Sequence, residues 1–482
     1  MSQKYAISRW PRYDDIKKKF DKLMSLPIVN LKKEAIEKYL KHFDEKCAKS
    51  KKMTTESKNY IPGAVQHNLS FNHPFPLVMT KADGAFLWDL DGNKYIDYLA
   101  AGGPTILGSN YKPVRDKLIE LINDCGPTTG LFHEYELKLA KLVNRLYPSC
   151  DMLRMLGSGT EADMAAIRLA RTYTGKKKVI KCGGAYHGWS DQLVYGLHVP
   201  GTGRFEAIGI PNEVSKHTKE FMPNDIEDLE KIMKKYEEKG GTACVLLEPL
   251  GPESGTRPVR KDFNQQVREL CDKYNSLLIF DEVVTGFRVA LGGAQEYFGI
   301  TPDLTVFGKA ITGTYPMAGG LGGRKDIMQY LAAGVESGKQ KCYVGGTLSA
   351  NPLSCAAGYF SILEIEKTNA HITAGKMGDR MCDGLQGIID KYNLPYVAWN
   401  YGSIVHLETS APMLVDLNDP KALPEVMPRK HAMEEFGMGL MGEGVISLAG
   451  SRFYVNMAHT EEIIDETISR FENVMSQSEA AC

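Results

Sequence analysis

The sequence predicts an α/β fold in which a mostly parallel sheet is covered by helices on both faces. Short apolar runs rich in β-branched residues alternate with helical patterns, as in strands joined by crossover helices. From about residue 350 the pattern changes to helices followed by short strands, which predicts a smaller α+β C-terminal domain. The predicted strands of the sheet lie at 179–181, 242–248, 277–281 and 303–307, and predicted helices at 225–239 and 262–274 separate several of them.

The remaining segments complete a division into domains. Residues 1–58 are rich in lysine and have mostly helical spacing, which predicts a helical N-terminal extension. Residues 86–98 alternate around Asp91-Gly92, the signature of a β-hairpin. Further helices are predicted at 113–124, 133–147, 356–366 and 378–392. We therefore expect a helical extension (1–58), a segment that joins the small domain (59–105), a large domain (106–349) and a small C-terminal domain (350–482).

The composition excludes several classes of protein. The 482 residues carry a formal net charge of -1, so nothing favours nucleic acid or a membrane surface as a partner. No apolar run approaches the roughly 20 residues of a membrane-spanning helix, and the N-terminus lacks the apolar core of a signal peptide. The ten cysteines are scattered without a C-x-x-C pair or metal-ligand spacing, which predicts buried free thiols, no metal and a cytoplasmic location.

Lys309 directly follows a predicted buried strand and Gly308. A lysine ammonium is rarely buried without a partner, so this position favours an amine that reacts. In a partly dry pocket the amine loses its proton more easily and can form an imine with an aldehyde. The alternative is an ordinary surface lysine in a turn.

Two further features of the sequence support a reactive role for Lys309. Asp281 ends the predicted strand at 277–281, and open α/β sheets bind ligands at such strand ends. A lysine and a carboxylate are what pyridoxal phosphate (PLP) needs, because the lysine holds the aldehyde and the acid keeps the ring nitrogen protonated. The small residues Ser158-Gly159-Thr160 precede a helix, whose free N–H groups suit a phosphate. The segment lacks the dinucleotide and Walker fingerprints.

The order of these motifs resembles the class III PLP-dependent aminotransferases of fold type I, over roughly residues 60–475. Two segments, Phe287 to Gln295 and Ala458-His459-Thr460, are similar to the glutamate-1-semialdehyde aminomutase branch of that family. The motifs that carry the resemblance are Ser158 to Ala162, Tyr186-His187-Gly188, Glu248-Pro249, Asp281 to Val283, Thr285 to Phe287, Gly308-Lys309 and Gly346 to Pro352.

The resemblance implies a seven-stranded type of sheet, a homodimer and a set of cofactor contacts. Lys309 would form the internal aldimine and move the proton, and Asp281 would pair with the pyridinium nitrogen. Tyr186 would stack on the ring and Val283 would pack on its other face. Ser158, Gly159 and Thr160 would hold the phosphate, His187 would join the cofactor-binding residues, and Thr347 would reach the phosphate of the neighbouring subunit.

Three residues bear on the substrate. Gln66 stands where the aminomutases have an arginine that grips the substrate carboxylate, whereas Glu253 and Arg452 match a pair found in two-substrate aminotransferases. These residues favour a transfer between an amino acid or amine and a keto acid or aldehyde; a loop glutamate and a surface arginine are the plainer interpretation. An aminomutase, a PLP racemase or epimerase, and a non-catalytic binding protein on the same fold remain as alternatives.

Overall fold

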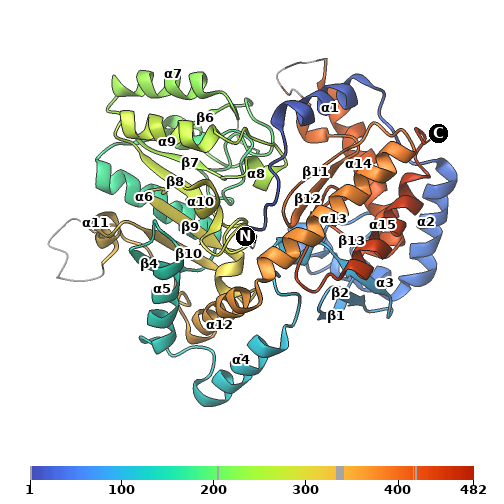
Figure 1. Cartoon of the computed structure of the whole chain (residues 1–482), viewed down its shortest axis with the longest axis horizontal. Helices are drawn as coiled ribbons and strands as arrows, with labels where there is room; N and C mark the ends of the chain where they lie inside the picture. Colours follow the sequence, from blue (N-terminus) through green and yellow to red (C-terminus); the bar gives the residue numbers. More distant parts are fainter. Residues whose placement is uncertain are drawn as a thin grey trace. The chain divides into compact units, whose positions relative to one another are not determined.

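The computed structural model describes residues 3–203, 206–332, 341–415, 417, 419 and 421–481. The chain divides into two compact units. The terminal unit consists of Met1–Tyr111 and Ala370–Cys482, and the central unit of Lys112–Asn369. Each unit is built around its own sheet or sheets (Figure 1).

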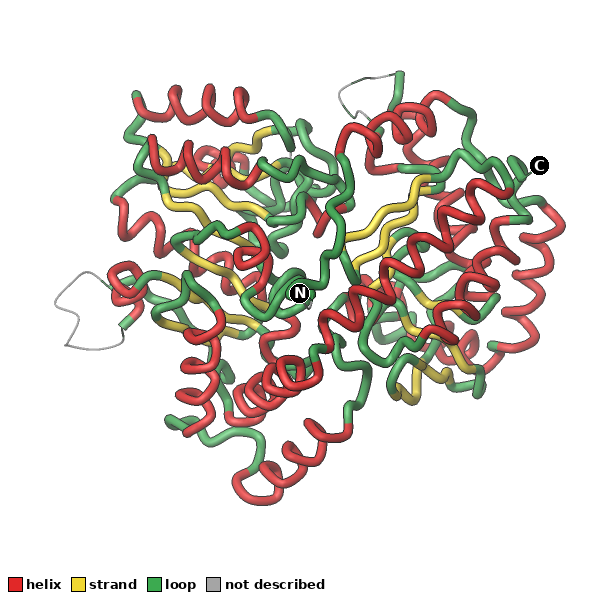
Figure 2. The backbone as a smooth tube through the Cα atoms, in the orientation of Figure 1, coloured by secondary structure: helices red, strands yellow, loops and turns green. Residues whose placement is uncertain are grey.

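The central unit contains a seven-stranded sheet with the order β4-β10-β9-β8-β7-β5-β6 (Figures 1 and 2). The strands from β9 to β6 run parallel to one another, and only β10 is antiparallel to its neighbours β9 and β4. The prediction of an α/β fold with a mostly parallel sheet is therefore confirmed. The strands are β4 (Met152–Leu156), β5 (Lys178–Cys182), β6 (Thr218–Phe221), β7 (Thr242–Leu247), β8 (Leu277–Asp281), β9 (Leu304–Gly308) and β10 (Gly319–Gly323).

The sequence did not predict β4, β6 or β10, and β10 shows why. Its five residues are Gly-Gly-Leu-Gly-Gly, which have low intrinsic strand propensity. A Cβ on Gly319 would lie 2.3 Å from the Ser158 carbonyl oxygen, and one on Gly322 would lie 2.3 Å from Cys150 Sγ. Close packing, rather than local propensity, therefore selects glycine in this strand.

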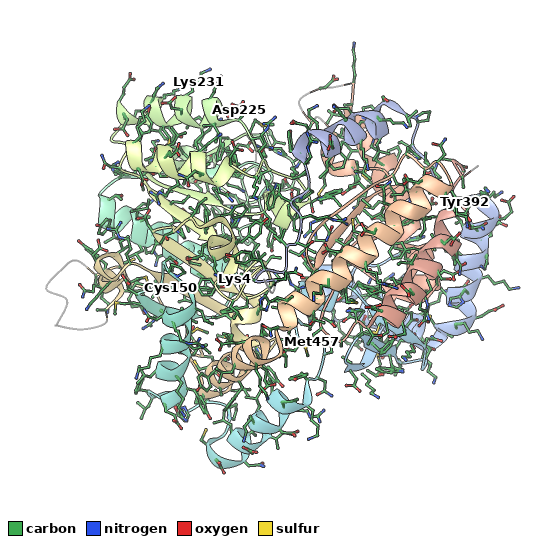
Figure 3. The ribbon with its side chains drawn as sticks, viewed as in Figure 1. Lys4, Cys150, Asp225, Lys231, Tyr392 and Met457 are labelled. Atoms are coloured by element: carbon green, nitrogen blue, oxygen red, sulfur yellow. The ribbon has the colours of Figure 1, made fainter. Side chains whose placement is uncertain are left out.

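Helices pack against this sheet, and α6 contacts most of its strands. Apolar residues of α6, such as Ala166 and Leu169, share one buried cluster with Leu246, Ile279 and Val306 of the sheet. Asp225, labelled in Figure 3, caps α7 by accepting a hydrogen bond from Asp228 N at 2.8 Å. The helices are α4 (Lys112–Cys125), α5 (Glu134–Leu146), α6 (Gly159–Thr174), α7 (Ile226–Glu237), α8 (Pro252–Gly255), α9 (Phe263–Lys273), α10 (Gly293–Phe298), α11 (Lys325–Met328) and α12 (Pro352–Thr368).

One element is grouped differently from the predicted division. We expected the small domain to begin at residue 350, which would include α12. The compact units instead divide between 369 and 370, because α12 packs on α4 and α5 of the central unit.

The terminal unit has two small sheets, with the orders β1-β2-β3-β13 and β11-β12-β14. The N-terminal extension packs within this unit: Phe20 and Trp399 lie 5.2 Å apart, centroid to centroid, and Phe43 is in the core. The predicted hairpin is formed by β2 and β3. The elements are α1 (Tyr13–Ser25), α2 (Lys33–Lys46), α3 (Ala48–Ser57), β1 (Met79–Asp83), β2 (Phe86–Asp89), β3 (Lys94–Asp97), α13 (Ala370–Lys391), β11 (Val397–Tyr401), β12 (Ile404–Glu408), α14 (Val426–Gly442), β13 (Val445–Ile446), β14 (Arg452–Tyr454) and α15 (Glu461–Met475).

Among the described residues, no helix combines the length and the apolar character that crossing a membrane requires. The nine cysteines within the described ranges are all free.

Candidate active site

The predicted site residues of the central unit follow strands that end at the same edge of its sheet. Strands β5, β7, β8 and β9 are parallel, and β4 points the same way because β10 is antiparallel to both β4 and β9. Their carboxyl ends therefore lie at one edge, where open α/β sheets bind ligands. Ser158 to Thr160 follow β4, Tyr186 and His187 follow β5, Glu253 follows β7, Asp281 ends β8, and Lys309 follows β9.

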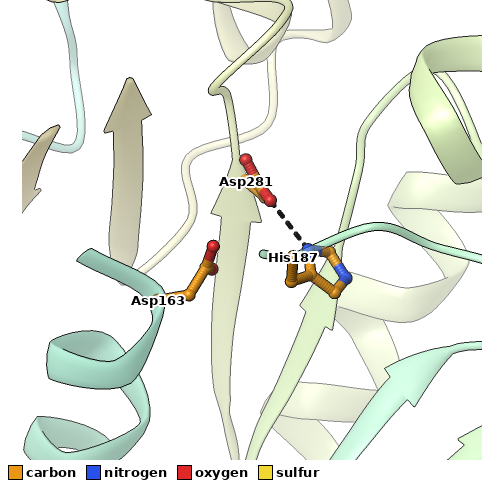
Figure 4. Close-up of side chains that lie close together, drawn as sticks. All are labelled: Asp163, His187 and Asp281. Carbon is orange, nitrogen blue, oxygen red and sulfur yellow. Dashed lines mark hydrogen bonds and ion pairs between the residues drawn. The ribbon is translucent and has the colours of Figure 1, made fainter. Parts of the chain in front are cut away.

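Asp281 and His187 form a buried pair at this edge (Figure 4). Asp281 Oδ2 lies 2.7 Å from His187 Nδ1, and the two side chains are 4% and 0% exposed. Asp281 Oδ1 also accepts a hydrogen bond from Val283 N at 2.9 Å. A carboxylate only accepts hydrogen bonds, so His187 Nδ1 carries the hydrogen. Burial lowers the pKa of His187, which keeps the imidazole neutral.

Lys309 begins a short 3₁₀ turn, Lys309–Thr312, directly after β9. Its backbone is left-handed, with φ +47°, which is uncommon for a residue with a side chain. The side chain is partly exposed and makes no hydrogen bond or ion pair with any described residue. An unpaired amine on strained backbone at a strand end is typical of a functional position.

The start of α6 presents backbone N–H groups at the same edge. Ser158 caps the helix, because its Oγ accepts a hydrogen bond from Glu161 N at 3.2 Å. Glu161 Oε2 in turn accepts a hydrogen bond from Gly157 N at 2.8 Å. The N–H groups of Gly159 and Thr160 have no preceding turn to bond to, so they can bind an anion.

Glycines bring these segments close together. A Cβ on Gly159 would lie 2.9 Å from Val283 Cγ2, and one on Gly308 would lie 2.8 Å from Val283 Cγ1. A Cβ on Gly188 would lie 2.1 Å from Thr160 Oγ1. The start of α6, the residue before Lys309 and the loop after β5 are therefore in contact through Val283 and Thr160.

Glu248, at the end of β7, joins two of the loops. It accepts hydrogen bonds from Tyr186 N at 2.9 Å, from Glu253 N at 2.7 Å and from Ser254 Oγ at 3.0 Å. Burial, together with the negative charge of Asp281, raises the pKa of Glu248 to about 7. Tyr186 itself is 45% exposed, so part of its side chain is accessible to a ligand.

Glu253 makes an ion pair that the sequence did not predict. Its Oε1 lies 2.9 Å from His198 Nε2, and Glu206 Oε2 lies 2.8 Å from His198 Nδ1. Burial alone would lower the pKa of His198, but the two carboxylates raise it to about 10. His198 is therefore a cation between two anions.

A model of the class III aminotransferases matches residues 69–475. The chain belongs to the class III aminotransferase family. This finding confirms the predicted family, the fold and the use of PLP. The enzyme catalyses PLP-dependent transamination, with an amino donor and a keto acceptor as substrates.

Solved structures agree with this assignment. An omega-transaminase from Sphaerobacter thermophilus is 25% identical, with a TM-score of 0.79 over 89% of this chain and 97% of that one. A β-phenylalanine aminotransferase from Variovorax paradoxus is 26% identical, with a TM-score of 0.77 over 91% and 96%. A glutamate-1-semialdehyde aminomutase from Pseudomonas aeruginosa shares the fold, at 21% identity and a TM-score of 0.78 over 95% and 99%.

The residues of this aminotransferase fit the cofactor. PLP needs an amine, an acid for the ring nitrogen and donors for a phosphate. Lys309 offers an unpaired amine, Asp281 offers a buried carboxylate, and the start of α6 offers N–H groups. Bulkier residues at Gly159 or Gly308 would collide with Val283 at this edge.

Three predicted site residues remain: Gln66, Arg452 and Thr347. Gln66 and Arg452 belong to the terminal unit, where Gln66 is exposed. Arg452 is buried at the start of β14, and its Nη1 donates a hydrogen bond to Tyr454 OH at 3.4 Å. Thr347 is exposed on the central unit.

Asp163 is a site residue that the sequence reasoning missed. It projects from α6, near the start of the helix, towards Asp281 and His187 (Figure 4). The available signal in the sequence was an acidic residue among the alanines and the isoleucine of an apolar helix face.

Proposed function

We propose that this enzyme is a two-substrate aminotransferase that moves an amino group from an amino acid or amine to a keto acid or aldehyde. The observation that carries the proposal is the juxtaposition of two neighbouring strand ends: Asp281, paired with His187, ends β8, and the unpaired amine of Lys309 follows β9. The family assignment gives the reaction. In our proposal Asp281 supplies the carboxylate for the ring nitrogen, and Lys309 supplies both the reacting amine and the base.

Bound PLP supplies an aldehyde that accepts the amino group and a ring that accepts electrons. In our proposal Lys309 Nζ would hold the cofactor and would accept and return a proton at a substrate carbon atom. Because the amine is unpaired and partly exposed, it is free both to react and to receive a substrate proton. No other described lysine follows a strand of the site edge in this way.

We propose the remaining cofactor contacts from the matching family motifs. Asp281 would hold its negative charge opposite the ring nitrogen, supported by the hydrogen bond from His187. Tyr186 would stack on the ring, and Val283 would pack on its other face. Ser158, Gly159 and Thr160, at the start of α6, would hold the phosphate.

On the substrate side we propose that Arg452 binds a carboxylate and that Glu253 and Gln66 line the same site. A buried guanidinium suits a planar carboxylate because it can donate two parallel hydrogen bonds. The β-phenylalanine aminotransferase of Variovorax paradoxus, named for an amino acid substrate, supports a carboxylate-bearing donor.

We further propose a homodimer in which Thr347 reaches the phosphate of the neighbouring subunit, and a reducing, cytoplasmic location. Leu131 and Phe132 support the dimer, since they are 81% and 75% exposed on the segment between α4 and α5. Large exposed apolar side chains mark interaction surfaces. The free cysteines support the location. Sedimentation of the wild type and of Leu131→Ser/Phe132→Ser tests the dimer; a monomeric wild type would contradict it.

An aminomutase is the second candidate, because the Pseudomonas aeruginosa aminomutase shares the fold. A ¹⁵N-labelled amino donor separates the possibilities. We expect the label to appear on an added keto acid or aldehyde of different carbon skeleton. Label that moves to a different carbon atom of the donor's own skeleton would establish an aminomutase, and inversion of the donor without an acceptor would establish a racemase.

Lys309→Ala tests the site itself. We expect label transfer to fall below detection, and borohydride treatment to leave no cofactor mass on the intact protein. The control is Lys325→Ala, an exposed lysine on α11, which keeps both signals. Covalent cofactor on the Lys309→Ala protein would overturn the assignment.

A further inference from the structure

Asp163 is a buried carboxyl group that the roles above leave unused. It is the fifth residue of α6 and is 1% exposed. Its Oδ1 is buried without a hydrogen-bond partner, and the side chain makes no hydrogen bond with any residue that the structure describes. An ionised carboxylate in such a place would have lost its hydration without replacement.

The neighbours of Asp163 make ionisation still less favourable. One oxygen of Asp163, one of Asp281 and a ring nitrogen of His187 lie within 4.8 Å of one another (Figure 4). Burial, the charge of Asp281 and then that of Glu248 raise the pKa of Asp163 well above its usual range. The nearby cation, Lys181, opposes this only weakly.

Lys181 is already engaged elsewhere. Its Nζ donates hydrogen bonds to the carbonyl oxygens of Ala185 at 2.9 Å and Leu193 at 3.1 Å. His187 is neutral, as its burial requires. The charged and titratable groups around Asp163 therefore offer it no cation to pair with, and a bound proton is the favourable state.

We propose that Asp163 is a positioning residue that carries a proton and donates it in a hydrogen bond to Asp281, so that Asp281 stays ionised opposite the cofactor's ring nitrogen. The proposal rests on the role proposed above for Asp281. Asp281 already accepts hydrogen bonds from His187 Nδ1 and Val283 N. A third donor stabilises the charged form further, because carboxylates that accept two or three hydrogen bonds hold their charge. One oxygen of Asp163 lies within 4.8 Å of one oxygen of Asp281, and the hydrogen bond requires the Asp163 side chain to move closer.

Infrared difference spectroscopy of the cofactor-free protein tests the protonation directly. We expect wild type minus Asp163→Asn at neutral pH to show the C=O stretch of a protonated carboxylic acid, shifted in D₂O. This signal is independent of PLP binding, so it survives even if the proposed function fails. The absence of a protonated acid band would overturn the proposal.

Cofactor affinity tests the hydrogen bond. Asp163→Asn keeps an N–H donor of similar shape and is expected to bind PLP within about threefold of wild type. Asp163→Leu removes the donor and is expected to lose about tenfold or more, the scale of one hydrogen bond to a charged group. Equal losses in both variants would show that an ionised Asp163 is needed, and equal retention would show no positioning role; either result contradicts the proposal. If Asp163→Leu does not fold, the infrared comparison decides.

Discussion

Among the described residues of the central unit, two histidine–carboxylate pairs differ in charge, because one histidine is neutral and the other is a cation. His187 and Asp281 are 2.7 Å apart and almost fully buried, with side chains 0% and 4% exposed. His198 and Glu253 are 2.9 Å apart, with side chains 38% and 13% exposed. Burial lowers the pKa of His187, whereas burial, the largest single effect on His198, is outweighed by two carboxylates that together raise its pKa to about 10.

The difference shows what decides the charge of a histidine beside an acid. His187 has one carboxylate and complete desolvation, so it stays neutral and acts as a hydrogen-bond donor. His198 has a second carboxylate, Glu206, and access to water, so it is a cation. His187 can therefore hold the Asp281 carboxylate in a fixed place by donating a hydrogen bond. The positive charge of His198 instead balances the negative charges of Glu253 and Glu206.

The largest effect is expected at the acid of the buried pair. Asp281→Asn removes the negative charge opposite the ring nitrogen while keeping the shape of the side chain. We expect kcat to fall on the order of 10²–10³-fold, as for other electrostatic contacts to the reacting group. Steady-state label transfer measures this, with PLP content determined in parallel. Wild-type kcat in a PLP-saturated Asp281→Asn enzyme would contradict the role.

His187 is the next test, because its contribution is a hydrogen bond. His187→Leu deletes the donor to Asp281, and we expect about a tenfold to hundredfold loss of kcat. His187→Asn is the matched control, since an amide N–H replaces the Nδ1 hydrogen and a loss of only a few-fold is expected. Equal losses in the two variants would mean that the imidazole, rather than its hydrogen bond, is required.

The buried pair was partly predictable from the sequence, and the reasons are local. A lysine after one apolar strand and an acid at the end of another mark a strand-end site, because parallel strands bring their ends to one edge. Asp281 and Glu282, adjacent in the sequence, could not be separated in this way. Glu282 accepts hydrogen bonds from Thr285 Oγ1 at 2.7 Å, Ala294 N at 2.7 Å and Gln295 N at 3.0 Å, which makes it a structural carboxylate.

The second pair was not predictable, because it depends on tertiary contacts between loops. His198 lies 55 residues before Glu253, in a loop without a regular pattern. Asp163 was missed for a similar reason: only the structure shows that its helix face turns towards Asp281. The glycine strand β10 likewise carries no strand propensity and is specified by the close approach of its neighbours.

Charge balance at the second pair predicts a change in substrate choice. Glu253→Gln removes a negative charge, so a substrate carboxylate is repelled less. We expect kcat/KM for carboxylate-bearing substrates to rise about fivefold relative to substrates without one, the scale of a partly exposed ion pair. Glu206→Gln is the control, because it removes the other carboxylate of His198 and leaves Glu253 charged. The role would be contradicted by an unchanged ratio, or by the same change in both variants.

The smallest effects are expected on the free energy of unfolding, and the contributions of His198 and His187 should change with pH in opposite directions. The pKa of His198 is raised, so its pair stabilises the fold below the unfolded value of about 6.5 and loses this contribution as pH rises through about 10. His198→Gln should therefore cost up to about 1 kcal/mol at pH 6, an amount limited by the exposure of the pair, and nothing above pH 10.

The pKa of His187 is lowered, so the wild type should lose stability as pH falls below about 6.5, and His187→Asn should abolish that loss. The free energy of unfolding of the cofactor-free proteins, from urea titrations at pH 5 to 10, measures both slopes. Parallel slopes in the two variants would show that the two histidines share one charge state and would refute the contrast between the pairs.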